Sequence, residues 1–225
     1  MSRSLFTSRE GGVSSAPYES FNLATHVGDE PMKVIENREI LAHRFEMGLE
    51  DIFFMNQVHG RDVAVIDEKS RSSDLPTADA LFTTRKGVAL VVLIADCIPL
   101  LLHSERAVAA VHVGRQGLVK GVFQATLDLF QSHGITSSEV RAELGPSICG
   151  QCYEVDGAMY DDVTKQIPAT ASSDSRLNIE AGLVSLLEEK GIAWSSLGEC
   201  TAHNDAYFSY RRDRVTGRQA GVITL

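Results

Sequence analysis

The stretch VALVVLIADCIPLLLHSERAVAAVHVGRQG, residues 88–117, decides the fold of this chain, because it contains the most apolar run. Residues 88–95 are apolar and rich in β-branched side chains, which predicts a strand buried on both faces. Two further apolar runs, 100–103 and 107–113, are separated by the polar residues 104–106 and predict two strands joined by a turn. The stretch therefore predicts the strands of a buried sheet.

The breaks between these strands carry the first candidates for chemistry. The first run stops at Asp96-Cys97, and Pro99 cannot donate a hydrogen bond within a central ladder. The third run ends with His112 and Val113, directly before Gly114. Side chains at the ends of buried strands are held rigidly at an edge of the core. Cys97 and His112 are therefore placed where a functional site is expected.

Composition limits the class of protein. The 225 residues are 44% hydrophobic and contain no linker or repeat, so we expect one domain over residues 1–225. The net charge of −9 argues against a nucleic-acid partner, because neutralising phosphates needs a basic face. No apolar signal segment opens the chain, and Asp96 interrupts the longest apolar run well short of a bilayer span. We expect a cytoplasmic protein with no membrane partner, either a monomer or a homodimer.

The other elements mix helices and strands without strict alternation. Residues 1–30 are rich in turn formers and are expected to form a loop that caps a sheet edge. This order of elements is typical of an α+β protein with mixed sheets. Helical spacing and apolar runs predict helices at 31–48, 118–132, 155–167 and 178–190, and strands at 51–54, 63–66, 80–84, 140–144 and 219–224.

Three side chains, His59, Cys97 and His112, form the leading candidate for a metal site. Two imidazoles and one thiolate suit zinc or copper, and three protein ligands leave a fourth tetrahedral position for water or substrate. None of the three lies at short ligand spacing from another, so only the fold can bring them together. Core packing of Cys97 and ordinary hydrogen bonding of the histidines remain the alternative at this point.

Cys97 also has the properties of a nucleophile. His112 or His59 would be its base, and Asp96 or Asn56 would orient that base. A thiolate serves both as nucleophile and as metal ligand. Residue types alone therefore do not separate a cysteine hydrolase from a metalloenzyme.

The remaining cysteines support weaker hypotheses. The segments 103–105 and 149–152 resemble the zinc deaminase signature only superficially, because no proline directly precedes Cys149. Cys149 and Cys152 are candidates for a redox pair or, with Cys200, for a structural metal site. A lone C-x-x-C outside a βαβ unit is thin support, so ordinary loop thiols are the expectation, and disulfides are not expected.

Several motifs occur in order from one end of the chain to the other. The motifs are FTSREGGVS (6–14), FNL (21–23), HVGD (26–29), NR (37–38), NQVHG (56–60), TADAL (77–81), ADCIP (95–99), GP (145–146), YEV (153–155), FSYRR (208–212) and TGR (216–218). Together they resemble the YfiH-like family, also called the laccase-domain, polyphenol oxidase or peptidoglycan-editing-factor family, which is associated with purine nucleoside phosphorylase activity.

The resemblance implies a layered α/β/β/α sandwich. It implies that His59, Cys97 and His112 bind one catalytic metal, usually zinc, with copper as the alternative. It implies the phosphorolysis of purine nucleosides such as adenosine and inosine, with adenosine deamination as a side activity. At matched motif positions, substrate contacts are expected from Asn22, His26, Arg38 and Gln57.

One motif departs from the family pattern. The family usually reads His-Ala-Gly-Trp-Arg-Gly where this chain has His112-Val113-Gly114-Arg115-Gln116-Gly117. We expect Arg115 either to replace the usual arginine one residue early or to accompany a weakened activity. Two other functions remain open: a copper-dependent polyphenol oxidase, and a metal-free cysteine hydrolase that edits peptidoglycan precursors through Cys97. The arginine-rich segment 211–218 has two interpretations: its arginines bind a phosphate, or it forms a charged turn exposed to solvent.

Overall fold

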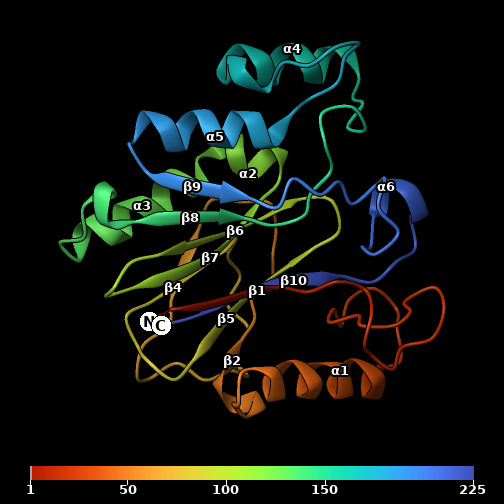
Figure 1. Ribbon diagram of the computed structural model, residues 1–225, viewed down its shortest axis with the longest axis vertical. Helices are drawn as coiled ribbons and strands as arrows, with labels where there is room; N and C mark the ends of the chain where they lie inside the picture. Colours follow the sequence, from red (N-terminus) through yellow and green to blue (C-terminus); the bar gives the residue numbers. More distant parts are fainter. Residues whose placement is uncertain (1) are drawn as a thin grey trace.

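The structure, a computed structural model, describes residues 2–225. Two β-sheets lie face to face, and helices cover both outer faces (Figure 1). The central stretch forms β5 (Ala89–Ile94), β6 (Ile98–His103) and β7 (Val108–Val113), all buried except for the end of β6. The stretch does not stay in one sheet: β5 belongs to the smaller sheet, and β6 and β7 belong to the larger. The chain crosses between the sheets at residues 95–97.

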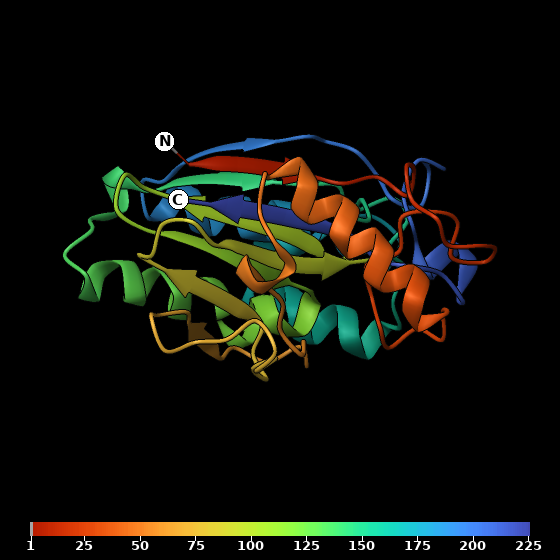
Figure 2. The same cartoon turned by 90° about the horizontal axis from the view of Figure 1, so that it is seen from below.

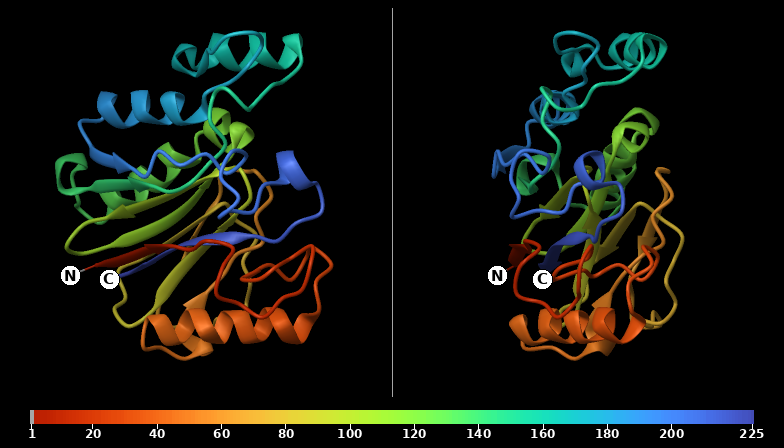
Figure 3. Two further views of the ribbon diagram at one scale, coloured as in Figure 1. Left: turned by 45° about the vertical axis from the view of Figure 1, so that its right-hand side comes forward. Right: turned by 90° about the vertical axis from the view of Figure 1, so that its right-hand side faces the viewer.

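The smaller sheet has the strand order β1-β10-β5-β2, with β1 (Arg3–Phe6), β10 (Gln219–Thr224) and β2 (Ile52–Phe53). Only β2 runs parallel to its neighbour. The two ends of the chain lie side by side, because Arg3 pairs with Thr224 (Figure 3). Helix α1 (Pro31–Arg44) crosses the outer face of this sheet, as Figure 2 shows, and buries Leu41 against it.

The larger sheet has the order β3-β4-β7-β6-β8-β9. Its outer face is covered by α2, α3 and α5, while α4 lies farthest from the sheets (Figure 1). The bounds are β3 (Val63–Val65), β4 (Ala80–Thr83), β8 (Arg141–Leu144), β9 (Ala193–Ser196), α2 (Arg115–Lys120), α3 (Val122–Ser132), α4 (Gly157–Gln166), α5 (Ile179–Glu189), α6 (Tyr210–Asp213), and the 3₁₀ helices η1 (Leu49–Asp51), η2 (Ser137–Glu139) and η3 (Pro168–Thr170).

The apolar run of β5 is continuous because both of its faces are covered. Val91 packs in the cluster under α1, whereas Leu90 and Val92 pack between the sheets with Leu101 and Ala110. Successive side chains of a strand point to opposite faces, so each layer receives alternate residues. The expected α+β class and the α/β/β/α sandwich are confirmed. No helix within residues 2–225 has the length and apolar character to cross a membrane.

Two expected boundaries are wrong for local reasons. Pro99 lies inside β6 and pairs with His112, although a break was expected there. The pairing of β6 with β8 begins at Leu100 and Leu144, so Pro99 lies beyond the last paired residue of β8 and no ladder hydrogen bond is needed from its nitrogen. The helix expected over 118–132 is two helices, because Gly121 has a φ of 83° and ends α2 before α3 begins.

Candidate active site

The crossing between the two sheets brings the three expected ligands together. His59 lies between β2 and β3, Cys97 lies at the crossing, and His112 lies near the end of β7. The Cys97 sulfur and one ring nitrogen of each histidine all lie within 4.8 Å of one another. The Cys97 Sγ is 3.9 Å from the His59 Nε2, and the imidazole rings meet edge to face with centroids 4.7 Å apart. The fold thus supplies the convergence that sequence spacing lacks.

Asp79, which precedes β4, holds both histidines and was not predicted as a site residue. Its fully buried carboxylate accepts the Nδ1–H of His112 at 2.8 Å and the backbone N–H of His59 at 2.9 Å. The N–H groups of Val58 and Gly60 donate to its other oxygen. With Nδ1 of His112 occupied, its Nε2 is left to face Cys97. A carboxylate behind a histidine ligand orients it and raises its basicity.

Charge is distributed within this cluster in a way that favours the thiolate. Burial raises the pKa of the Cys97 thiol, but His112 and His59 outweigh burial and bring it down to about 6. Burial lowers the pKa of His112, yet Cys97 and Asp79 outweigh it and raise it to about 9. The thiolate is the form of cysteine that binds metals and attacks electrophiles.

Gly114 keeps the space beside the cluster open. A Cβ at this position would lie 2.9 Å from the Cys97 Sγ and 3.1 Å from the His59 ring. Real Cβ atoms do not approach so closely without a shift of their neighbours. A glycine is therefore required directly after β7 by the close approach of the ligand atoms.

Asp96, beside Cys97, fixes the crossing by an unusual backbone conformation. Its φ is 97°, a backbone conformation that residues other than glycine rarely adopt. Its carboxylate accepts hydrogen bonds from the Thr201 and Ser209 hydroxyls and from the Arg211 N–H, each at 2.7 Å. These contacts tie the Cys97 loop to a segment more than 100 residues later.

A cavity of about 590 Å³ opens from the three converging side chains. Asp96 is the one acidic residue among those that line it, and its carboxylate is already satisfied by the hydrogen bonds above. Apolar and aromatic walls are supplied by Phe54, Ile148, Tyr153 and Ile179. The lining includes five arginines: Arg38, Arg115, Arg211, Arg214 and Arg218.

Of the expected substrate residues, His26, Arg38 and Gln57 line this cavity. The Gln57 side-chain amide exchanges two hydrogen bonds with the Leu93 backbone, at 2.8 and 2.9 Å, so its polar atoms are occupied. Asn22 is fully buried and is not one of the lining residues; its Oδ1 accepts the N–H of Arg218. Any effect of Asn22 on a ligand would therefore act through Arg218.

Arg115 reaches the cavity from the first position of α2. Its Nε is buried and has no hydrogen-bond partner within residues 2–225. A buried, unpaired N–H is costly, and a guanidinium offers five donors in a fixed fork. This residue, at the point where the motif departs from the family pattern, thus has a free donor beside the converging ligands.

The cavity concentrates positive charge in an acidic protein. Burial lowers the pKa of Arg38 to about 10 and also lowers that of Arg218. The pKa of His26 is lowered by burial and then by Arg218 and Arg38, which disfavours a further cation there. Partly desolvated guanidinium groups are stabilised by an anion, and the oxygens of a carboxylate or a phosphate match their fork of donors.

The sequence of the chain matches a family model and named relatives along nearly its whole length. A family model described as multi-copper polyphenol oxidoreductase laccase matches residues 3–225. A purine nucleoside phosphorylase of Streptomyces griseus is 42% identical over 228 residues, covering 98% of this chain and 93% of that protein. Another, from Corynebacterium glutamicum, is 41% identical over 231 residues, covering 99% and 94%.

A solved structure shares the whole architecture. A protein of Neisseria meningitidis is 34% identical and superposes with a TM-score of 0.89, covering 100% of this chain and 94% of that one. Both the sequence match and the fold match extend over nearly the full length of each partner. The chain therefore belongs to this laccase-domain family, the YfiH-like family that its motifs resemble.

Proposed function

We propose that the protein is a zinc-dependent purine nucleoside phosphorylase that acts on adenosine or inosine. One observation carries the proposal: the cavity joins His59, Cys97 and His112 to five arginines with no free carboxylate among its lining residues. A nucleoside and phosphate together need an apolar wall for the base and cations for the oxyanion. The names of the curated relatives support the same reaction.

Arg115 and Arg211 are the proposed phosphate ligands. The Nε of Arg115 is unpaired, and the Arg211 side chain donates only to the Glu154 carbonyl, at 3.0 Å, while its guanidinium lies 5.2 Å from the Tyr153 ring centroid. Both therefore have free N–H groups for a phosphate. Arg218 is held by the Thr216 and Gly217 carbonyls and adds charge from a fixed place.

The purine is expected against the apolar part of the lining. Tyr153 and Phe54 offer aromatic side chains, although the Phe54 face already carries the Arg38 guanidinium at 3.8 Å. Ile148 and Ile179 extend the same wall. A base placed there would hold its ribose toward the arginines, so that phosphate and C1′ are brought together by binding alone.

The three ligands fit zinc by their chemistry. A thiolate and two neutral imidazoles form a catalytic zinc set, Asp79 orients His112, and Gly114 leaves room for the ion. Zinc would supply a Lewis-acid positive charge at the wall of the cavity. In the reaction itself, a phosphate oxygen bonds to C1′, the C1′–N9 bond breaks, and the purine leaves with the bonding electrons and takes up a proton. The arginines hold the phosphate for this attack and balance its charge.

The test is chromatography of adenosine incubated with the purified protein, with and without inorganic phosphate. The proposal requires adenine and ribose 1-phosphate only when phosphate is present. Arg115→Gln should raise KM for phosphate, whereas Arg106→Gln, far from the cavity lining, serves as the matched control. Inosine formed without phosphate would assign the protein as a deaminase, and no turnover of adenosine or inosine would refute both.

One arrangement favours a second candidate, the cysteine hydrolase. Asp79 contacts His112, and His112 lies beside Cys97, so the three side chains are arranged as orienter, base and nucleophile. Asp79 takes the role for which Asp96 or Asn56 was expected. Activity that survives a strong chelator and is abolished by iodoacetamide at Cys97 would favour this function. Activity lost on chelation and restored by zinc would refute it. Copper binds the same donors, so copper-loaded protein assayed with a phenol tests the oxidase alternative.

A further inference from the structure

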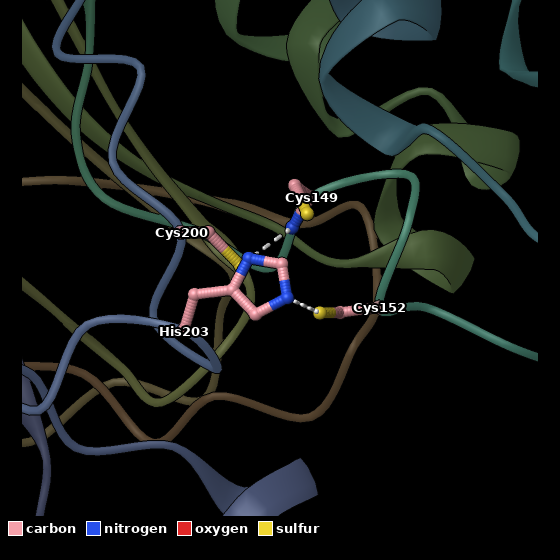
Figure 4. Close-up of side chains that lie close together, drawn as sticks. All are labelled: Cys149, Cys152, Cys200 and His203. Atoms are coloured by element: carbon pink, nitrogen blue, oxygen red, sulfur yellow. Dashed lines mark hydrogen bonds between the residues drawn. The ribbon is translucent and has the colours of Figure 1, made fainter.

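A second group of metal-binding side chains lies outside the cavity. Cys149 and Cys152 come from the loop between β8 and α4, and Cys200 and His203 come from the segment between β9 and α6. Their three sulfurs and one ring nitrogen all lie within 4.8 Å of one another. Figure 4 shows the His203 ring between the cysteines, with its Nε2 2.8 Å from the Cys152 Sγ. None of the four side chains belongs to the residues that line the cavity.

Two turns prearrange the four ligands as pairs. The carbonyl of Cys149 accepts the N–H groups of Cys152 and Tyr153, at 3.0 and 3.1 Å, so both sulfurs of the C-x-x-C segment face the same side. The carbonyl of Cys200 accepts the N–H groups of His203 and Asn204 at 3.3 and 2.9 Å. A C-x-x-C pair and a C-x-x-H pair that converge from two segments form the ligand pattern of structural zinc sites.

The donor spacing matches a tetrahedral ion. Zinc binds thiolate sulfur at about 2.3 Å and imidazole nitrogen at about 2.0–2.1 Å, which places neighbouring ligand atoms roughly 3.5–4 Å apart. The distances here run from 2.8 Å between the His203 Nε2 and the Cys152 Sγ to at most 4.8 Å, so an ion would draw the wider pairs together and move this close pair slightly apart. The backbone N–H of Cys149 also points at the Cys200 Sγ, at 3.4 Å, and such a donor stabilises a thiolate.

An ion would resolve the repulsion within this cluster. The sulfurs of Cys149, Cys152 and Cys200 lie within 4.8 Å of one another, and three thiolates cannot share so small a volume without a compensating positive charge. No disulfide joins any of the four cysteines, so the three neighbouring thiols of this cluster are left without a bonded partner. A divalent ion compensates three thiolates at one point, and soft thiolate ligands with one imidazole select zinc.

We propose that Cys149, Cys152, Cys200 and His203 bind a structural zinc ion that is separate from the catalytic site. The ion would join the two loops that form one wall of the cavity. The first loop supplies Ile148 and Tyr153 to the lining and anchors Asp96 through the Ile148 N–H, at 2.9 Å. The second leads from Cys200 to Thr201, which donates to the Asp96 carboxylate. With four protein ligands the site is closed, so it carries no reaction.

Metal counting tests the proposal without any assay of activity. Protein that is purified with reductant, equilibrated with zinc and desalted should carry two zinc ions per chain, as measured by elemental mass spectrometry. Cys97→Ala should retain one, because it leaves the second cluster intact. Cobalt loaded into this variant should show the visible bands of a tetrahedral ion and strong thiolate-to-cobalt charge transfer, since three of its four ligands would be sulfur.

Further variants separate the two sites. Cys200→Ala should also retain one ion, and the Cys97→Ala/Cys200→Ala double variant should retain none. His203→Ala should bind the second ion more weakly, whereas His43→Ala, an exposed histidine at the end of α1, should keep both.

The proposal is overturned if Cys97→Ala, folded by circular dichroism, retains no zinc. It is also overturned if the denatured wild-type protein, with chelator present, yields two free thiols in place of four. That result would mean a disulfide in the cluster. Because the Cys97→Ala measurement leaves every residue of the cluster unchanged, it stays decisive even if Cys200→Ala does not fold.

Discussion

At the scale of single residues, one buried carboxylate organises the candidate active site. Asp79 reaches both histidine ligands and leaves no oxygen unpaired. In the proposed zinc site, a group that contacts both histidines in this way would act on the metal through their orientation and not through contact with substrate. Its role is therefore that of a positioning residue.

The variant Asp79→Asn keeps the size of the side chain but removes its charge. We expect its affinity for zinc to fall by about 10–100-fold, because the His112 ring loses the partner that fixes its tautomer. Competition against a chelating dye measures this affinity. Asp128→Asn, an exposed acid on α3, is the matched control and should leave the affinity unchanged. An equal affinity in both variants would contradict the role given to Asp79.

The variant Gly114→Ala tests the space around the ligands. The backbone there has a φ of −86°, which alanine adopts freely, so any effect comes from the new methyl group beside Cys97 and His59. We expect loss of zinc at the catalytic site and loss of turnover. Gly157→Ala, whose methyl group would meet nothing within 4 Å, should behave as wild type. Full zinc content in Gly114→Ala would show that the ligands have more room than their distances indicate.

The three proposed ligands and the C-x-x-C pair could be picked out from the sequence, whereas the residues that hold them could not. Asp79 lies in a recognisable motif, yet nothing in its neighbourhood connects a carboxylate at 79 with rings at 59 and 112. Cys200 was paired with the C-x-x-C segment as an open possibility, whereas His203 was missed because it needs two distant loops to meet. Such contacts depend on the tertiary fold, at the crossing between the sheets and between distant loops, and not on local sequence pattern.

At the scale of elements, strong apolar periodicity was predictable and short or exposed elements were not. The limits of β10 match the predicted strand, since six consecutive residues are buried. In contrast, β9 carries the exposed Trp194 and β1 is only partly buried, so neither has a clean alternation to detect. Strands at sheet edges are specified by their partners more than by their own residues.

The break between α2 and α3 gives a prediction at this scale. Gly121→Ala should destabilise the protein by about 1–2 kcal/mol, because a Cβ is disfavoured at its φ of 83°. Denaturant unfolding monitored by circular dichroism gives the free energy. Zinc content should stay at the wild-type value, because both clusters lie outside the turn. If Gly121→Ala is as stable as Gly157→Ala, the left-handed conformation does not limit the fold.

At the scale of the whole molecule, charge is unevenly placed. The chain carries a net charge of −9, yet five arginines converge on one cavity. The mutual repulsion of these charges destabilises the folded protein when the cavity is empty, and a bound anion relieves it. Ligand binding is therefore linked to the free energy of unfolding. The arginine side chains also attract anions over a range that salt shortens.

Inorganic phosphate should therefore raise the thermal midpoint, and the rise should grow with the logarithm of its concentration above Kd. Differential scanning fluorimetry at constant ionic strength, with chloride as the balancing anion, measures it. Arg115→Gln should reduce the shift and Arg106→Gln should leave it unchanged. An identical shift with chloride alone would mean that the cavity does not select phosphate. The expectations of one domain over residues 1–225 and of a monomer or homodimer stay predictions.

The position of β10 between β1 and β5 has a consequence for how the chain reaches this structure during synthesis. Strand β1 has no neighbour in its sheet until β10 has been made. Three arginines that line the cavity, Arg211, Arg214 and Arg218, are synthesised just before β10. Synthesis proceeds from the N-terminal side, so β1 must wait unpaired, and β5 must wait with β2 as its neighbour on one edge and with its other edge open. During that wait the open edges of β1 and β5 can pair with strands of other chains, so shielding of these edges by a chaperone would favour correct folding.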